Sequence, residues 1–260
     1  MKNDSASDPQ VEMRIAPHQP SWPRRALHVA LDLIFPPICP FCGERMEAEA
    51  SALCDSCRRR IEEPRPPLCA LCGASVPPNH KSRYCRGCPP RPIHFDSAFA
   101  AARYEGPGAE MVKSLKFGHC LEMAPEMARR MFVALVDTLP EIGPVDFLIP
   151  VPLHWTRRWR RGFNQSEAIA AELGRLAGVP AMQRNLIRIR RTRRQTALEP
   201  GERMRNVEHA FALAEPAALD GRRVLLIDDV FTTGATANVC ARVLKEAGAE
   251  AVHVFTFARA

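Results

Sequence analysis

Residues 223–236, RVLLIDDVFTTGAT, decide the fold. The apolar residues 224–227 are typical of a strand buried on both faces, and this strand runs directly into two carboxylates, Asp228 and Asp229. A turn of hydroxyl residues and glycine follows, and a helical pattern begins at Ala235. At the carboxyl end of a parallel strand, such a turn gathers backbone N–H groups at a helix N-terminus, where Gly234 lets them approach an anion closely. The stretch therefore predicts a phosphate-binding turn.

The acid pair needs its own explanation, because two carboxylates beside a phosphate would repel it. Sugar hydroxyls donate hydrogen bonds to carboxylates, and Mg²⁺ accepts carboxylate ligands. A sugar phosphate with Mg²⁺ nearby therefore satisfies both parts of the stretch. A strand that ends in an ordinary loop is the alternative, since acid pairs at strand ends are common by themselves.

Strands and helices alternate from about residue 93 onward. Apolar runs predict strands at residues 96–104, 145–150, 186–189, 224–227 and 251–258. Helical periodicity covers residues 109–117, 121–137, 165–176 and 235–247. This alternation predicts an α/β fold, in which a parallel sheet carries helices on both faces.

Ahead of this region lie four Cys-x-x-Cys pairs. The pairs are Cys39/Cys42, Cys54/Cys57, Cys69/Cys72 and Cys85/Cys88. A shift of 30 or 31 residues carries the first two pairs onto the last two, so the unit is a repeat that occurs twice. Four thiolates per unit match the tetrahedral ligand set of a structural Zn²⁺, which predicts a double zinc ribbon with two zinc ions.

Disulfides are one alternative to zinc, but the first residues contain no secretion signal, and disulfides do not persist in a reducing compartment. Redox-active Cys-x-x-Cys pairs are a second alternative, but four copies in a repeat argue against it. The repeat favours sequential sites over a crossed pairing, although spacing alone leaves the pairing open. A closed four-thiolate site is expected to stabilise the fold rather than to catalyse. Cys120 and Cys240 are expected to be buried structural residues.

Positive charge is concentrated in one segment. The net charge of the chain is +7, yet residues 157–205 alone hold 13 arginines, no lysine and 4 acidic residues. Such a window predicts a phosphate-bearing ligand, either a nucleotide or a nucleic-acid backbone, and a solvated basic face is the alternative. Where this window begins, Trp155 and Trp159 alternate with Arg158 and Arg160. Such a mixture is typical of surfaces that bind single-stranded nucleic acid, and the alternative is that the tryptophan rings pack on their own domain.

The start of the chain is polar and contains prolines. Residues 1–19 predict a disordered tail, and residues 20–35 predict a short amphipathic helix that docks on the protein's own core more readily than on a membrane. No apolar run is long enough to span a membrane, so we expect a cytoplasmic protein. The double zinc ribbon is expected at residues 36–92 and the α/β domain at residues 93–260.

Residues 223–236 resemble the ribose-phosphate motif of type I phosphoribosyltransferases. Together with the cysteine pairs, the segments IPVPLHWTRRWRRGFNQSEAIA and RRTRRQTALEPGERMRNVEHAF resemble the ComF family of competence-associated proteins, from about residue 33 to the end. The resemblance implies that Asp228 and Asp229 hold the ribose hydroxyls of phosphoribosyl pyrophosphate. It implies that the 5′-phosphate is held by the turn residues Thr232, Thr233, Gly234, Ala235 and Thr236.

The same resemblance implies two further loops around the ligand. The pyrophosphate loop would contain Val151, Pro152, Arg157, Arg161 and Gly162. A flexible loop would close over the ligand with Gln195, Arg203 and Asn206. Both loops draw on the arginine-rich window, and the forked donors of arginine suit a polyphosphate.

Three functions are compatible with these features. The resemblance implies a role in DNA uptake, with binding of single-stranded DNA and a link to the uptake machinery. A working transferase would release pyrophosphate from C1 of the ribose as an unidentified amine or base nitrogen attacks, with Mg²⁺ as cofactor. A sensor would bind phosphoribosyl pyrophosphate without turnover. An ammonia-channelling amidotransferase is not expected, because the chain has no N-terminal cysteine nucleophile.

Overall fold

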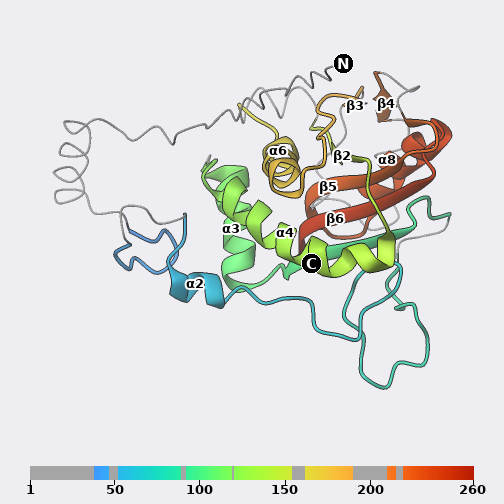
Figure 1. Ribbon diagram of the computed structural model, residues 1–260. Helices are drawn as coiled ribbons and strands as arrows, with labels where there is room; N and C mark the ends of the chain where they lie inside the picture. Colours follow the sequence, from blue (N-terminus) through green and yellow to red (C-terminus); the bar gives the residue numbers. More distant parts are fainter. Residues whose placement is uncertain are drawn as a thin grey trace, which may run out of the picture.

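The molecule is built on a four-stranded parallel sheet (Figure 1). The computed structural model describes residues 38–46, 52–88, 92–118, 120–153, 162–189, 210–214 and 219–260. Across the sheet, the strands lie in the order β1 (Ser97–Arg103), β6 (Ala251–Arg259), β5 (Arg223–Phe231) and β2 (Phe147–Pro150). All neighbouring strands are parallel, which confirms the predicted fold class.

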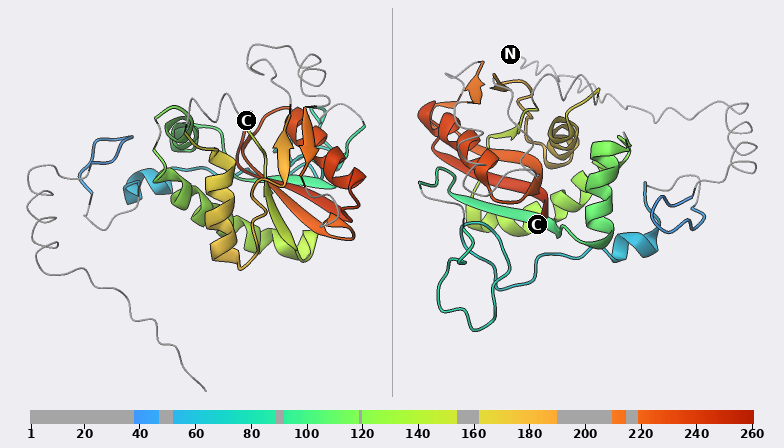
Figure 2. Two further views of the ribbon diagram at one scale, coloured as in Figure 1. Left: turned by 90° about the horizontal axis from the view of Figure 1, so that it is seen from above. Right: turned by 180° about the vertical axis from the view of Figure 1, so that it is seen from behind.

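Helices cover both faces of this sheet, as the two views of Figure 2 show. One face carries α3 (Gly106–Phe117), α4 (Met123–Ile142) and α6 (Gln165–Ala177). The other face carries α8 (Ala235–Glu246) and an antiparallel pair of short strands, β3 (Leu186–Arg188) and β4 (Phe211–Leu213). The sheet is therefore the middle of three layers.

The apolar run of β5 is buried on both sides because its side chains alternate between two cores. Leu225 and Ile227 belong to the core under α4 and α6, whereas Val224 and Leu226 belong to the core under α8. All four side chains are fully buried. Burial of each stabilises the fold by about 1.5–3 kcal/mol, which explains why the strand is apolar without interruption.

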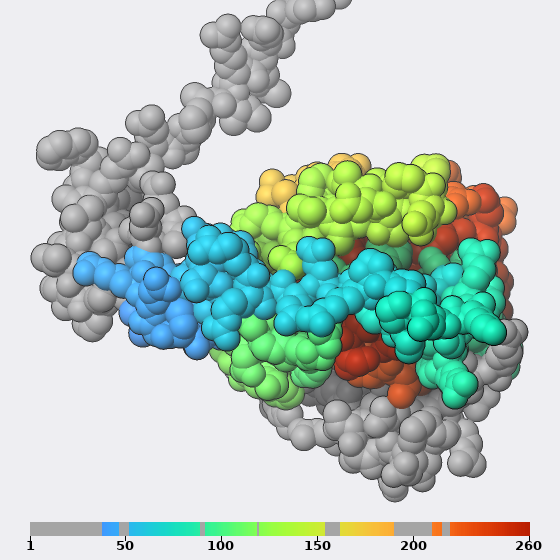
Figure 3. All heavy atoms as spheres, turned by 90° about the horizontal axis from the view of Figure 1, so that it is seen from below, coloured from blue at the N-terminus to red at the C-terminus, as the bar shows by residue number. Residues whose placement is uncertain are grey.

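The two cysteine-rich ribbons lie against the α/β domain. In Figure 3, residues 38–46 and 52–88, coloured blue to teal, run as a band across one face of the molecule. The first ribbon contains the short helix α2 (Asp55–Arg59), and its buried side chains share one core with α3 and α4. Arg58 of α2 forms an ion pair with Glu126 of α4, which is only 5% exposed (Nε to Oε1, 2.7 Å). The first ribbon is therefore joined to the domain by apolar and ionic contacts.

The second ribbon covers the edge strand β1. The backbone N–H of Ala98 donates to the carbonyl oxygen of Leu71 (2.7 Å). At Gly73, whose φ is +65°, a Cβ would lie 2.6 Å from the carbonyl oxygen of Ala98. Only glycine allows this close approach of two backbones, and the ribbon thereby closes the edge of the sheet to other strands.

The predicted strands and helices are present, with shifted ends. The strand β5 was expected at residues 224–227 but continues through the acid pair to Phe231. The cause is β6, which pairs with β5 in parallel as far as Phe231 and Arg259. Helix α4 also runs on to Ile142, and the strand β4 was not expected.

Some expectations for the outer parts of the chain lie outside the described residues. These are the tail at residues 1–19 and the helix at residues 20–35. In the part of the chain that the structure describes, no helix is long and apolar enough to cross a membrane. Cys240 is fully buried, as expected, whereas Cys120 is only partly buried.

Candidate functional site

Two strands end and two helices begin at one edge of the sheet. β2 ends at Pro150 beside Ile227 of β5, which continues through the acid pair to Phe231, and the starts of α6 and α8 face this part of β5. Gly234 is the N-cap residue of α8. Its φ is +73°, a left-handed value that glycine adopts without strain. In the described part of the chain, Gly234 offers no side chain to cap α8, and the first turn of α8 holds no acidic residue. The positive end of the helix dipole at this point favours an anion.

The five predicted turn residues surround this helix start. Thr232 is exposed, Thr233 and Thr236 are partly buried, and Gly234 and Ala235 are buried. Within the described part of the chain, Oγ1 of Thr233 is buried without a hydrogen-bond partner, and so is Nε2 of Gln165 in the first turn of α6. An unpartnered buried donor costs about 1–3 kcal/mol, and a ligand with acceptor oxygens removes that cost.

Asp228 is held by hydrogen bonds at the end of β5. Its Oδ1 accepts from the hydroxyl of Ser166 in α6 (2.9 Å) and from the backbone N–H of Asp229 (2.9 Å). Burial, followed by the negative charge of Asp229, raises the pKa of Asp228 from 3.8 to about 7. A carboxyl group whose pKa lies near neutrality is typical of a functional site.

Asp229 forms an ion pair with Lys116 near the end of α3. Their Nζ and Oδ1 atoms are 2.7 Å apart, and the two side chains are 24% and 9% exposed. Burial lowers the pKa of Lys116, but the charge of Asp229 and their hydrogen bond outweigh burial and leave it raised. The ion pair therefore keeps a carboxylate in place beside Asp228.

We expect Asp228→Asn to stabilise the unliganded protein at high pH. Because the pKa of Asp228 is raised by folding, the folded state binds more protons between about pH 4 and 7, and stability falls as pH rises through that range. Asparagine keeps the acceptor oxygen but carries no charge. In urea unfolding, the stability of the variant relative to the wild type should increase by on the order of 1 kcal/mol or more between pH 5 and pH 8. A difference that does not change with pH would contradict the assignment.

The predicted loop residues are only partly described. Val151 and Pro152 are buried directly after β2, and the backbone N–H of Val151 donates to the carbonyl oxygen of Ile227 (2.8 Å). Gly162, with φ of +79°, is exposed shortly before α6. The other loop and nucleic-acid candidates lie outside the described residues: Arg157, Arg161, Gln195, Arg203, Asn206, Trp155, Arg158, Trp159 and Arg160.

Three polar residues of the site were not expected. Lys116 and Ser166 contact the acid pair from different helices. Asn164 begins α6, because its Oδ1 accepts from the N–H of Ser166 (3.2 Å) while its Nδ2 donates to the carbonyl oxygen of Val151 (3.1 Å). The only signal in the sequence was a polar run before a helical pattern, which indicates a helix start but not its neighbours.

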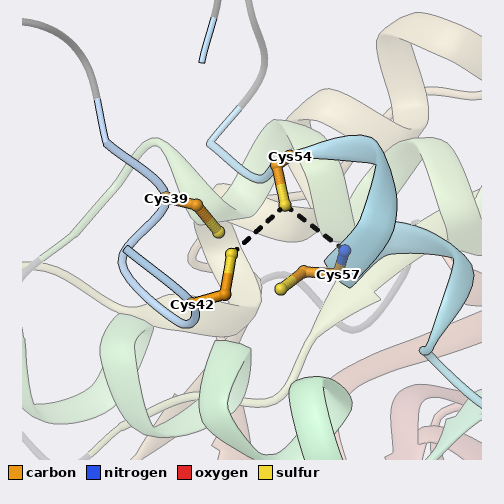
Figure 4. Close-up of side chains that lie close together, drawn as sticks. All are labelled: Cys39, Cys42, Cys54 and Cys57. Atoms are coloured by element: carbon orange, nitrogen blue, oxygen red, sulfur yellow. Dashed lines mark hydrogen bonds between the residues drawn. The ribbon is translucent and has the colours of Figure 1, made fainter. Parts of the chain in front are cut away.

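The first four cysteines converge on one point (Figure 4). Cys39 and Cys42 come from a turn at Gly43, and Cys54 and Cys57 come from the start of α2. All four sulfurs lie within 4.8 Å of one another, and those of Cys42 and Cys54 are 3.5 Å apart. Tetrahedral zinc–thiolate bonds of about 2.3 Å imply sulfur separations of about 3.8 Å, so the geometry fits zinc.

The last four cysteines repeat this arrangement. Separations between the sulfurs of Cys69, Cys72, Cys85 and Cys88 include values from 3.4 to 4.0 Å. In both ribbons the glycine after the second cysteine donates its N–H to the carbonyl oxygen of the first cysteine (2.9 Å). None of the ten cysteines forms a disulfide. The repeat predicted sequential clusters, and the structure brings the cysteines together in that way.

Comparison with known proteins covers both parts of the chain. A double zinc ribbon domain matches residues 30–89, and a phosphoribosyl transferase domain matches residues 160–260. Competence protein F of Haemophilus influenzae is 30% identical over 225 residues, which are 85% of this chain and 96% of that protein. DNA utilization protein YhgH of Escherichia coli K12 is 31% identical over 229 residues, which are 87% of this chain and 99% of that protein. Competence protein ComFC of Bacillus subtilis is 28% identical over 214 residues, which are 80% of this chain and 84% of that protein.

The fold, the acid pair and the cysteine clusters define a phosphoribosyltransferase domain joined to a double zinc ribbon. The similarity to Competence protein F extends over nearly the whole length of that protein, so it includes both parts in the same order. The chain belongs to the ComF family of competence proteins.

Proposed function

We propose that the protein binds phosphoribosyl pyrophosphate, together with Mg²⁺, where α6 and α8 begin. The observation that carries the proposal is the acid pair directly before a turn in which the buried hydroxyl of Thr233 has no hydrogen-bond partner among the described residues. The ribose 2′ and 3′ hydroxyls donate to Asp228 and Asp229, and the 5′-phosphate accepts from the N–H groups at the start of α8. Each part of the ligand thereby meets a group of complementary charge or hydrogen-bonding capacity.

The pyrophosphate end of the ligand requires positive charge and further donors. In this proposal it lies toward the start of α6, near Val151, Pro152 and Gly162, where the amide of Gln165 supplies a donor. Arg157 and Arg161 supply charge. The second loop closes over the ligand with Gln195, Arg203 and Asn206.

Calorimetry of the full chain tests this proposal. Phosphoribosyl pyrophosphate with Mg²⁺ should bind at one site per chain. Ribose 5-phosphate should bind more weakly because it lacks the pyrophosphate, and omission of Mg²⁺ should lower the affinity of the full ligand. No heat of binding under any of these conditions would refute the proposed function.

A pyrophosphate-release assay separates the two ways in which such a site acts. Release that depends on an added base or amine would identify a transferase and its acceptor. Tight binding without release across the screen would identify a sensor. In a transferase, pyrophosphate leaves C1 of the ribose with the bonding electrons as the acceptor nitrogen attacks, and Mg²⁺ and arginines neutralise the departing charge.

Binding of single-stranded DNA is a second candidate function. Two relatives carry the names Competence protein F and DNA utilization protein, and the arginine-rich window provides the charge that a nucleic-acid backbone requires. In this proposal the protein acts in DNA uptake, together with uptake machinery. The two clusters of four free cysteines suit a reducing compartment, so we propose that it does so in the cytoplasm.

We expect single-stranded DNA to bind with strong salt dependence. Each contacted phosphate contributes a slope of about −0.7 to the dependence of log K on log salt, so Arg158→Ala and Arg160→Ala should each reduce the slope by about one contact. Trp159→Ala should cost about 1–3 kcal/mol if its ring stacks on a base. Arg175→Ala is the matched control, since this arginine is already paired with Glu172 on α6. Binding that does not respond to salt would exclude this surface.

A further inference from the structure

Arg259 lies between the phosphate turn and the second cysteine cluster. It is the last residue of β6 and pairs in register with Phe231, the last residue of β5. Its Nη1 donates to the carbonyl oxygens of Phe231 (3.0 Å) and Thr232 (2.8 Å), and its guanidinium lies 4.8 Å from the centre of the Phe231 ring. One side chain therefore holds the backbone where the turn begins.

The other end of the same guanidinium faces a cysteine of the ribbon. Nη2 of Arg259 is 3.8 Å from Sγ of Cys72, which is fully buried. Nη1 also donates to the oxygen of Ala260 (2.8 Å). Four thiolates around Zn²⁺ carry a formal net negative charge, so a loaded cluster would attract the guanidinium that lies beside Cys72.

A second link ties the start of α8 to the segment that follows the ribbon. Nδ2 of Asn238 donates to the carbonyl oxygen of Pro92 (2.9 Å), and the backbone N–H of His94 donates to its Oδ1 (2.7 Å). Cys69, Cys72, Phe231 and Ala235 also belong to one hydrophobic core. Ribbon, turn and helix start are therefore packed as one unit, in which Arg259 holds the turn and Asn238 holds the start of α8.

We infer that Arg259 is a positioning residue that couples zinc in the second cluster to the phosphate turn. The inference rests on the proposed function, since the turn is taken to hold the 5′-phosphate. With zinc bound, the guanidinium stays between Cys72 and the carbonyl oxygens of Phe231 and Thr232, and the N–H groups beyond them keep the orientation that an anion needs. Without zinc, the cluster opens and the turn loses this support.

Coupling of this kind is reciprocal, which makes it measurable without catalytic activity. In equilibrium competition with a coloured chelator, saturating phosphoribosyl pyrophosphate with Mg²⁺ should raise the zinc affinity of one site in the wild type by about fivefold or more. Arg259→Gln should abolish this effect and weaken ligand binding by a similar factor. Arg223→Gln is the matched control, because Arg223 lies at the opposite end of β5 and also donates to backbone carbonyl oxygens, those of Ile142 and Pro144. It should keep the coupling.

Hydrogen exchange separates a failure of this inference from a failure of the proposed function. Even without ligand, Arg259→Gln should speed amide exchange in residues 232–237, whereas Arg223→Gln should not. If calorimetry finds no ligand, the exchange result still decides whether Arg259 holds the turn. If the ligand binds but leaves the zinc affinity of the wild type unchanged, the coupling is refuted, whether or not the variant folds.

Discussion

Gly234→Val is expected to raise the dissociation constant for phosphoribosyl pyrophosphate at least about a hundredfold. The residue has a φ of +73°, which valine adopts only with strain, and a branched side chain there keeps a phosphate away from the N–H groups of α8. Loss of two charge-assisted hydrogen bonds, each worth about 1.5–3 kcal/mol, corresponds to a factor of this size or more. Calorimetry at fixed Mg²⁺ measures it, and zinc content should not change.

Gly221→Val is the matched control for this variant. Gly221 has a similar φ of +64° in the turn before β5, and no atom lies within 4 Å of the position of its Cβ. The control therefore introduces the same backbone strain far from the site, and it should lower stability without changing affinity. Unchanged affinity in Gly234→Val would rule out the turn as the phosphate site, and equal losses in both variants would assign the effect to folding.

Cys57→Ser is expected to remove one of two zinc ions per chain and to destabilise the α/β domain as well. Metal analysis of protein purified without added zinc should give about two ions for the wild type and about one for the variant. Cys57 shares its core with Met111 and Met127, so an opened ribbon exposes apolar surface of α3 and α4. Structural zinc contributes on the order of 10 kcal/mol in small zinc domains, and even a third of that lowers the unfolding midpoint by about 10 °C.

Cys120→Ser is the control, because this cysteine belongs to neither cluster. It should keep both zinc ions and unfold close to the wild-type temperature. If Cys57→Ser lost one zinc ion but left the unfolding midpoint of the α/β domain unchanged, the first ribbon would not contribute to the stability of that domain despite their shared core.

Local sequence patterns predicted most of the fold. The alternation of strands and helices, the cysteine repeat and the turn after the acid pair each depend on residues close together in the chain, and each is present. The length of β5 could not be predicted in the same way, because it depends on the neighbouring strand β6. The strand β4 has three residues, too few for a periodic signal to distinguish it from a loop.

The candidate site was predictable in its centre but not around it. Asp228, Asp229 and the turn lie in one continuous stretch with a recognisable order. Lys116 and Ser166 reach the acid pair only through the packing of α3 and α6 on the sheet. The role of Arg259 could not be predicted either, because its contact with Cys72 depends on the packing of the second ribbon against the sheet.

The most direct measurement is a crystal structure of the protein with phosphoribosyl pyrophosphate and Mg²⁺. We predict the 5′-phosphate within hydrogen-bonding distance of the backbone N–H groups at the start of α8, and the ribose hydroxyls against Asp228 and Asp229. Clear density for the ligand elsewhere, with the turn and the acid pair unchanged and empty, would contradict the central claim.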